Sequence, residues 1–231
     1  MLLNKRIDIP DDWYHKLKHF IESDKFTALG KQIAQLRKTT TVYPAKEEVF
    51  KAFQLTPFRQ VKVVILGMDP YPGVYQGQPI ACGLAFAPRN TEYTTPSLRK
   101  IYDRIKADFY MNELTFPVDL NLRKWPRQGI LLLNTALTVE AGKSGSHMKL
   151  WSEWTEEVLK AINENNTDVV FCFWGNDAAK HAHLIGENNI VLRSQHPMAA
   201  HYTGSDWECD HFIKINKHLE TQNNHPITWI T

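Results

Sequence analysis

Residues 61–72 read VKVVILGMDPYP, an apolar run that breaks into a glycine, an acid, two prolines and a tyrosine. The run Val61–Leu66 is rich in Val, Ile and Leu, which predicts a strand buried on both faces. Gly67 frees the backbone for a tight turn that the prolines stiffen, so Asp69 is held at the carboxyl end of a strand. Ligands bind at that edge of open α/β sheets, which makes Asp69 and Tyr71 the first candidates for chemistry. An Asp-Pro turn that only closes the strand is the alternative interpretation.

Length and composition favour one compact domain. A chain of 231 residues with 43% hydrophobic content can bury a sizeable core. No repeat, low-complexity tract or linker divides it, so we expect a single domain over residues 1–231. The formal net charge is only +2, and any contact with nucleic acid must therefore depend on a local patch and on backbone donors.

Cysteine usage and targeting signals point to the cytoplasm. The three cysteines are widely spaced, which argues against a disulfide framework and for a reducing compartment. Cys209 and His211, in WECDH, could form half of a metal site, but without a second ligand pair no metal is expected. The first ten residues carry no secretory pattern, and no apolar run reaches membrane-spanning length. We expect a cytoplasmic protein, or a nuclear one in a eukaryote.

Strand and helix patterns alternate along the rest of the chain. Further apolar runs occupy residues 130–133, 169–174 and 190–192, and helical periodicity covers residues 11–38, 45–53, 96–109, 151–165, 177–185 and 210–222. Such alternation implies right-handed crossovers and a parallel sheet. We therefore predict an α/β fold, a three-layer sandwich in which a central four-stranded parallel sheet is flanked by helices.

Three of the four predicted strands end near a residue suited to chemistry: Asp69, Asn134 and His196. A parallel sheet brings such ends to one edge. Each residue also has a plain structural interpretation, since Asn134 could cap a turn and His196 could simply precede a proline. Their joint occurrence at strand ends favours a site. Thr95 is an N-cap candidate with Pro96 at the first helical position, and that helix start offers N–H groups to a phosphate.

The ordered motifs resemble those of the family 1 uracil-DNA glycosylases. The likeness begins near Pro44 and continues to the last helix, through VYPAKEEVFKAF, PFRQVKVVILGMDPYPG, GLAFAP, TTPSLRKIY, QGILLLNTALTVEAGKSGSHMKLW, VVFCFWGNDAAKH and HPMAAH. One of these motifs would be weak, but all of them in the family's order are specific. The resemblance implies a DNA glycosylase that flips uracil out of DNA and hydrolyses its N-glycosidic bond, starting base-excision repair.

The resemblance also implies a role for each matching pocket residue. Phe86 matches the aromatic residue that stacks on uracil, and Asn134 matches the amide that reads the pyrimidine edge and rejects cytosine. Tyr71 matches the residue that excludes the methyl group of thymine. Asp69 suits the cationic sugar and the attacking water, while neutral His196 donates to uracil O2. Backbone N–H groups near Met68 assist, and no metal or organic cofactor is required.

Several positions depart from the family's pattern. Pro72 replaces the histidine of DPYH, which removes a donor beside the water, and the link between Gly73 and Cys82 is longer than usual. HPMAAH replaces HPSPLS, so Met198 stands where a serine would contact phosphate, and Ala200 stands where a leucine would enter the DNA stack. The expected DNA contacts are Pro96, Ser97, Met198, Ala200, His201 and Tyr202.

The expected partner is uracil-containing DNA, single- or double-stranded, and a proteinaceous glycosylase inhibitor is a further candidate. A monomer suffices, because the inferred site lies within one chain, and no membrane partner is expected. A second hypothesis is a catalytically weak DNA-holding module of the same superfamily. A third, a nucleotide-binding enzyme of another α/β class, is weakened by the absence of a G-x-G-x-x-G or P-loop motif.

Overall fold

A parallel sheet lies at the centre of the molecule, with its strands in the order β5-β2-β7-β8. The structure is a computed structural model that describes residues 8–90, 92–110 and 122–230. The strands are β2 (Val63–Gly67), β5 (Ile130–Asn134), β7 (Val170–Trp174) and β8 (Ile190–Ser194). The predicted α/β fold with a four-stranded parallel sheet is confirmed.

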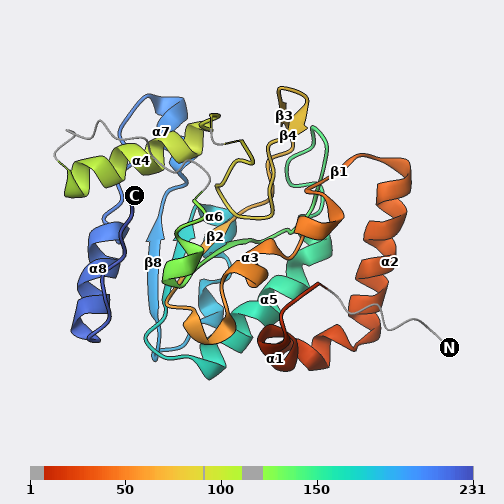
Figure 1. The fold of residues 1–231 in the computed structure, drawn as a ribbon, viewed down its shortest axis with the longest axis horizontal. Helices are drawn as coiled ribbons and strands as arrows, with labels where there is room; N and C mark the ends of the chain where they lie inside the picture. The colour runs from red at the N-terminus through yellow and green to blue at the C-terminus, as the bar shows by residue number, and fades with distance from the viewer. Residues whose placement is uncertain (1–7, 91, 111–121, 231) are drawn as a thin grey trace.

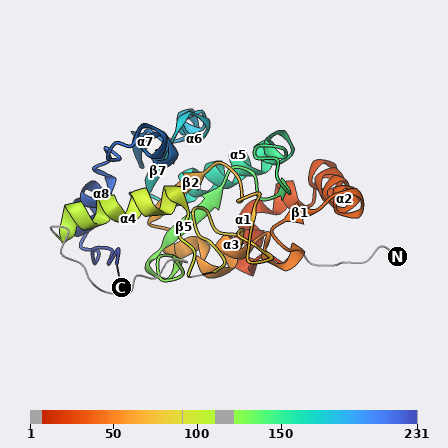
Figure 2. The same ribbon diagram turned by 90° about the horizontal axis from the view of Figure 1, so that it is seen from above.

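Helices cover both faces of this sheet, as Figure 2 shows from above. They are α1 (Asp11–Ile21), α2 (Asp24–Thr39), α3 (Lys51–Leu55), α4 (Pro96–Phe109), α5 (Met148–Asn165), α6 (Asn176–Ala179), α7 (Pro197–Thr203) and α8 (His211–Thr221). Helix α4 connects β2 to β5 in one direction across the sheet, whereas α5 and α6 connect strands in the other. Right-handed crossovers therefore place α4 on one face and α5 and α6 on the other. No helix among the described residues is both long and apolar enough to cross a membrane.

Three of the predicted helical stretches are not continuous helices. The stretch 45–53 forms a 3₁₀ turn, Lys46–Glu48, followed by α3. The stretch 11–38 forms α1 and α2, because the Ser23 hydroxyl accepts from the backbone N–H of Phe26 at 3.3 Å and so starts a new helix. The stretch 177–185 forms α6 and a separate 3₁₀ turn, Ala182–Leu184. Two short turns with apolar residues at helical spacing resemble one longer helix in sequence.

Two small antiparallel ladders were not expected. Strand β1 (Val42–Tyr43) pairs with β6 (Val139–Glu140), and β3 (Val74–Tyr75) pairs with β4 (Gln78–Pro79). Strands of two residues are too short to show the alternation by which a strand is predicted. The second ladder lies in the long link between Gly73 and Cys82.

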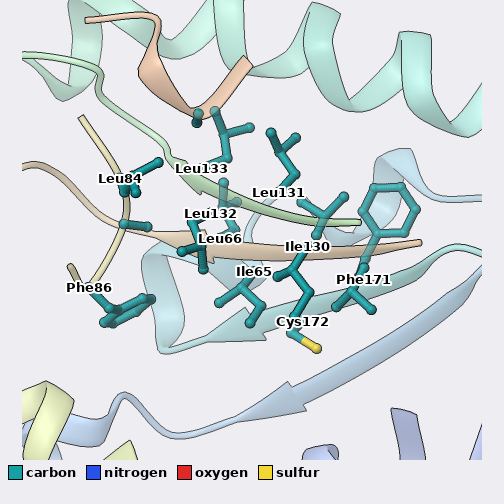
Figure 3. Packing of buried hydrophobic residues seen from close by; sticks show 14 of the residues in the cluster. Ile65, Leu66, Leu84, Phe86, Ile130, Leu131, Leu132, Leu133, Phe171 and Cys172 are labelled. Atoms are coloured by element: carbon teal, nitrogen blue, oxygen red, sulfur yellow. The ribbon is translucent and has the colours of Figure 1, made fainter. Parts of the chain in front are cut away.

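The core is built on three of the four central strands. Every residue of β2, β5 and β7 is buried, as expected for strands covered on both faces. Figure 3 shows Ile65, Leu132 and Phe171 packed among their neighbours on adjacent strands. Strand β8 lies at an edge and is only partly buried. This packing gives the loops at the strand ends a rigid base.

The strands β2 and β7 are parallel neighbours in the sheet, and the connections that leave them run to opposite sides. From β2 the chain crosses to β5 on one side, and from β7 it crosses to β8 on the other. Loops that leave adjacent parallel strands in opposite directions open a crevice at their carboxyl ends, and ligands bind in such crevices.

Candidate active site

A cavity of about 430 Å³ lies at this crevice. Its walls come from the loops after β2 and β7, residues 67–72 and 174–178, and from Asn134 at the end of β5. His196, which follows β8, also lines it, as do Phe86 and Ser97. The predicted convergence of Asp69, Asn134 and His196 is therefore present in the structure.

Asp69 is held by the loop between β6 and α5. One carboxylate oxygen accepts from the backbone N–H of Gly145 at 2.6 Å, and the Ser144 hydroxyl donates to the carboxylate at 3.1 and 3.2 Å. Burial raises the pKa of Asp69 above its ordinary value, because desolvation outweighs these two hydrogen bonds. Asp69 is therefore a fixed carboxylate with lone pairs still facing the cavity.

Asn134 reaches the cavity only because residue 67 is a glycine. The two residues are paired across the β2–β5 ladder, and a Cβ atom at Gly67 would overlap Oδ1 of Asn134. The Asn134 side chain is 6% exposed, and none of the described residues forms a hydrogen bond with its amide group. A buried amide without a protein partner is available to a ligand that fills the cavity.

His196 caps helix α7. Its Nδ1 accepts from the backbone N–H of Met198 at 3.0 Å, which leaves Nε2 to carry the proton of a neutral ring. Burial lowers the pKa of His196, while the charge of Asp177 raises it less. Gly175, with φ of +98°, lets the ring approach, since a Cβ there would lie 2.9 Å from His196 Cβ.

Tyr71 is held by hydrogen bonds to Thr95, at the start of α4, and to Phe86. Its hydroxyl lies 2.8 Å from Thr95 Oγ1 and donates to the carbonyl of Phe86 at 3.2 Å. Thr95 Oγ1 also accepts from the backbone N–H of Leu98, so Thr95 caps α4 as predicted, with Pro96 at the first turn. Burial raises the pKa of the Tyr71 phenol, which stays protonated.

Phe86 forms an aromatic wall and has an unusual backbone. Its ring centroid lies 5.7 Å from that of His196 and 5.2 Å from that of Trp174. Its φ of +62° is uncommon for a residue with a side chain and is typical of functional sites. Met68 lines the cavity beside it, and among the described residues none accepts from the backbone N–H of Met68 or Asp69. The backbone N–H donors of Met68 and Asp69 and the apolar ring of Phe86 therefore border the same cavity.

Three of the six predicted DNA-contacting residues line the cavity, whereas Pro96, Ala200 and His201 are not among its lining residues. Ser97 and Met198 line the cavity. Tyr202 also lines it and is 79% exposed, and His201 is exposed beside it. Ala200 is only 5% exposed, which corrects the expectation that its side chain faces DNA at the wedge position. Helix α7 packs its Ala200 side inward, which puts Tyr202 in solvent.

Sequence reasoning missed Asp177. This carboxylate lines the cavity, pairs with Lys180 at 2.6 Å, and its charge raises the pKa values of both Asp69 and His196. The residues Asn176 and Asp177 follow β7 directly, so the rule that placed Asp69 at a strand end could have found it.

The described residues contain no group of three or more His, Cys, Asp or Glu that could hold a metal ion. Cys209 is buried, and His211 Nδ1 accepts from the indole N–H of Trp174 at 2.9 Å. The Cys209 and His211 pair therefore belongs to the packing beneath β7.

The fold and the cavity together define an α/β enzyme-like protein with a carboxylate, an amide and an imidazole at the strand ends. The model of the Uracil DNA glycosylase superfamily matches residues 53–220. A uracil-DNA glycosylase of Desulfitobacterium hafniense is 35% identical over 96% of each chain. One of Campylobacter concisus is 38% identical over 96% of this chain and 94% of its own.

Solved structures agree with these matches. The crystal structure of mimivirus uracil-DNA glycosylase superposes with a TM-score of 0.87 at 26% identity, over 98% of this chain and 89% of that one. A single-residue variant of mimivirus UNG in complex with UGI gives a TM-score of 0.88 at 27% identity, over 98% and 91%. The chain belongs to the uracil-DNA glycosylase superfamily.

Proposed function

We propose that this protein is a DNA glycosylase that flips uracil out of DNA and hydrolyses its N-glycosidic bond, the first step of base-excision repair. One observation carries the proposal: Asp69, Asn134, His196 and Phe86 line one cavity. These are the groups that the reaction needs, in a protein whose relatives are named uracil-DNA glycosylases. A DNA-holding module without activity is not favoured by those relatives or by the complete set of cavity residues.

Base recognition depends on Asn134, Tyr71 and Phe86. The Asn134 amide oxygen accepts from uracil N3–H and its nitrogen donates to O4, whereas cytosine would leave buried groups unpaired. The Tyr71 ring, fixed through Thr95 and the Phe86 carbonyl, occupies the space beside C5 and excludes thymine. Phe86 stacks on the flipped base.

The chemistry adds water across the bond between C1′ and N1. The sugar becomes cationic as the bond breaks, and the bonding electrons move to the uracil ring. Asp69 stabilises the sugar and orients the water, which bonds to C1′ and loses a proton to solvent through Asp69. His196 donates from Nε2 to uracil O2, and the N–H groups of Met68 and Asp69 add to this stabilisation. The products are uracil, which takes a proton from solvent, and an abasic deoxyribose.

DNA contacts surround the cavity. The start of α4 at Pro96 and Ser97 faces a phosphate with its N–H groups and hydroxyl. Met198, His201 and Tyr202 contact the duplex from α7, and exposed Tyr202 enters the stack in the space left by uracil. Pro72 provides no donor beside the water, which lowers turnover relative to enzymes with histidine there.

The remaining proposals concern organisation. Residues 1–231 act as one glycosylase domain, as a monomer in the cytoplasm, on single- or double-stranded uracil-containing DNA. The UGI complex of mimivirus UNG supports a proteinaceous inhibitor as a partner of this chain. Size-exclusion chromatography with and without such an inhibitor tests the monomer and the complex together.

The test of the function is release of base from labelled oligonucleotides that differ at one position. A uracil-containing strand should be cut at an alkali-sensitive abasic site after incubation, while matched cytosine and thymine strands remain intact. Tight binding of the uracil strand without any release would favour the DNA-holding module instead.

A further inference from the structure

The β3–β4 hairpin is a feature that the proposed reaction does not use. It comprises Val74–Tyr75 and Gln78–Pro79, and its turn residues Gln76 and Gly77 both have positive φ, 48° and 76°. Among the residues that the structure describes, the two strands pair only with one another. An isolated hairpin of this size is marginally stable by itself, so other contacts must hold it.

Arg89 fixes the base of the hairpin. Its guanidinium donates to the carbonyls of Pro79 at 3.2 Å and Ala81 at 3.1 Å, and forms a two-point ion pair with Glu48, which is 8% exposed. The Arg89 backbone N–H also donates to Ile80 at 2.7 Å. Paired, partly buried hydrogen bonds of this kind are strong and restrict geometry, so the hairpin has a fixed orientation.

The segment that leads into the hairpin is tied to the active site. Pro72 lines the cavity, and its carbonyl accepts from the backbone N–H of Gly142 at 2.9 Å, in the loop whose Ser144 and Gly145 hold Asp69. The hairpin and α7 project from the same edge of the molecule in Figure 1. DNA that approached the cavity from this edge would lie beside this hairpin as well as beside α7.

Tyr75 links the hairpin to the start of α4. Its ring stacks on Tyr93, with centroids 4.4 Å apart and planes 24° from parallel, two residues before the Thr95 cap. Both tyrosines are half-buried, and neighbouring Val74 is 55% exposed. Residues 73–88 contain no charged side chain, so this rim is aromatic, aliphatic and amide in character.

We propose that the β3–β4 hairpin is a second DNA-contacting element, which holds a base flanking the flipped uracil against Tyr75 and Val74. A neutral rim with an aromatic ring suits a base better than a phosphate, and stacking on such a ring accepts any base. The surface is continuous with the cavity through Pro72. The inference rests on the proposed function but adds a site that the chemistry does not need.

The test separates flanking contacts from chemistry by substrate length. Uracil release is measured on single strands that carry uracil at the centre of three nucleotides and on strands extended by six nucleotides on the 5′ side, the 3′ side or both. Tyr75→Ala should raise KM on an extended strand about tenfold, with kcat within twofold. The same variant should have the native KM on the three-nucleotide substrate. The extension, 5′ or 3′, on which Tyr75→Ala raises KM identifies the side of the uracil that contacts the hairpin.

Three further variants complete the design. Tyr75→Phe keeps the ring and should keep the native KM, whereas Val74→Glu, at an exposed position, should raise KM on extended strands by charge repulsion. Phe109→Ala, an exposed aromatic residue at the far end of α4, is the control and should have no effect.

An unchanged KM for Tyr75→Ala on every extended strand would overturn the inference, and the hairpin surface would then be a candidate site for a protein partner. An equal rise in KM for Tyr75→Ala on the three-nucleotide substrate would also overturn the inference, because Tyr75 would then act on the shape of the cavity and not on a flanking base. Failure of the native protein to release uracil would instead contradict the proposed function.

Discussion

The backbone N–H of Met198 donates to Nδ1 of His196 at 3.0 Å, and this single contact decides which ring nitrogen faces the cavity as a donor. The neutral ring must then carry its proton on Nε2. Burial supports the neutral form by lowering the pKa of His196. The first turn of α7 thus orients the imidazole.

The first prediction is a pH profile with one acid limb. The proposed reaction needs Asp69 ionised and His196 neutral, so both groups act in their deprotonated forms. Burial raises the pKa of Asp69 and lowers that of His196. Activity should fall as pH drops through the higher of the two pKa values. Single-turnover rates at constant ionic strength, from about pH 4 to about pH 8, measure the limb. This range extends from the ordinary pKa of an Asp carboxyl group to above that of a His imidazole.

The charge of Asp177 should shift this limb. Asp177→Asn removes a negative charge that raises both pKa values, so the limb should move to lower pH. Lys180→Met leaves Asp177 without its ion-pair partner at 2.6 Å and should move the limb the opposite way. Identical profiles for the three proteins would show that Asp177 does not act on the reacting groups.

The second prediction concerns Gly67. Gly67→Ala places a methyl group onto Asn134 Oδ1, so the amide must move away from the base. We expect kcat/KM on uracil strands to fall about 100-fold, as in other cases of a misplaced positioning group. Gly30→Ala, in α2 with nothing within 4 Å of the new atom, is the control. It should keep full activity and stabilise the fold by about 0.5–1 kcal/mol. Native activity in Gly67→Ala would remove Asn134 from base recognition.

The third prediction is a change of specificity in two pocket walls. Asn134→Asp should admit cytosine weakly, and Tyr71→Ala should admit thymine, each with a loss of uracil activity. Tyr71→Phe is the matched control, because it removes the hydroxyl bonds to Thr95 and the Phe86 carbonyl but keeps the ring. It should still reject thymine. If circular dichroism shows intact folds and neither variant releases a new base, the pocket geometry is wrong.

The fourth prediction distinguishes Tyr202 from Ala200. Flipping from a duplex costs a few kcal/mol, part of which an inserted side chain recovers. Tyr202→Ala should therefore slow release from double strands at least tenfold and from single strands by less than about twofold. Ala200→Leu should instead overpack the buried side of α7 and lower stability by about 1–3 kcal/mol, without faster duplex cleavage. Faster duplex cleavage by Ala200→Leu would restore position 200 as the wedge.

The sequence was informative where one residue type has one physical use. The hydrophobic runs predict the buried strands, and the topology of a parallel sheet then predicts that Asp69, Asn134 and His196 meet at one edge. Thr95 and Pro96 similarly identified the start of α4.

The misses involve contacts between segments that are distant in sequence. The burial of Ala200 depends on the packing of α7 against α4, and the hairpin depends on Arg89 and Glu48, 41 residues apart. No periodicity reports such contacts. Asp177 was missed for a different reason. It is the first residue of the stretch 177–185, whose periodicity predicts a helix, and an acidic residue at a helix start already has a structural use.

The most direct test of the account is single-turnover uracil release from a single-stranded oligonucleotide by the native protein, Asp69→Asn and His196→Leu. DNA binding by each protein is followed by fluorescence anisotropy. We predict that the native protein releases uracil and that each substitution slows release about 100-fold or more, with the affinity for DNA nearly unchanged. Release by Asp69→Asn or His196→Leu at the native rate would contradict the central claim that these two residues carry the chemistry.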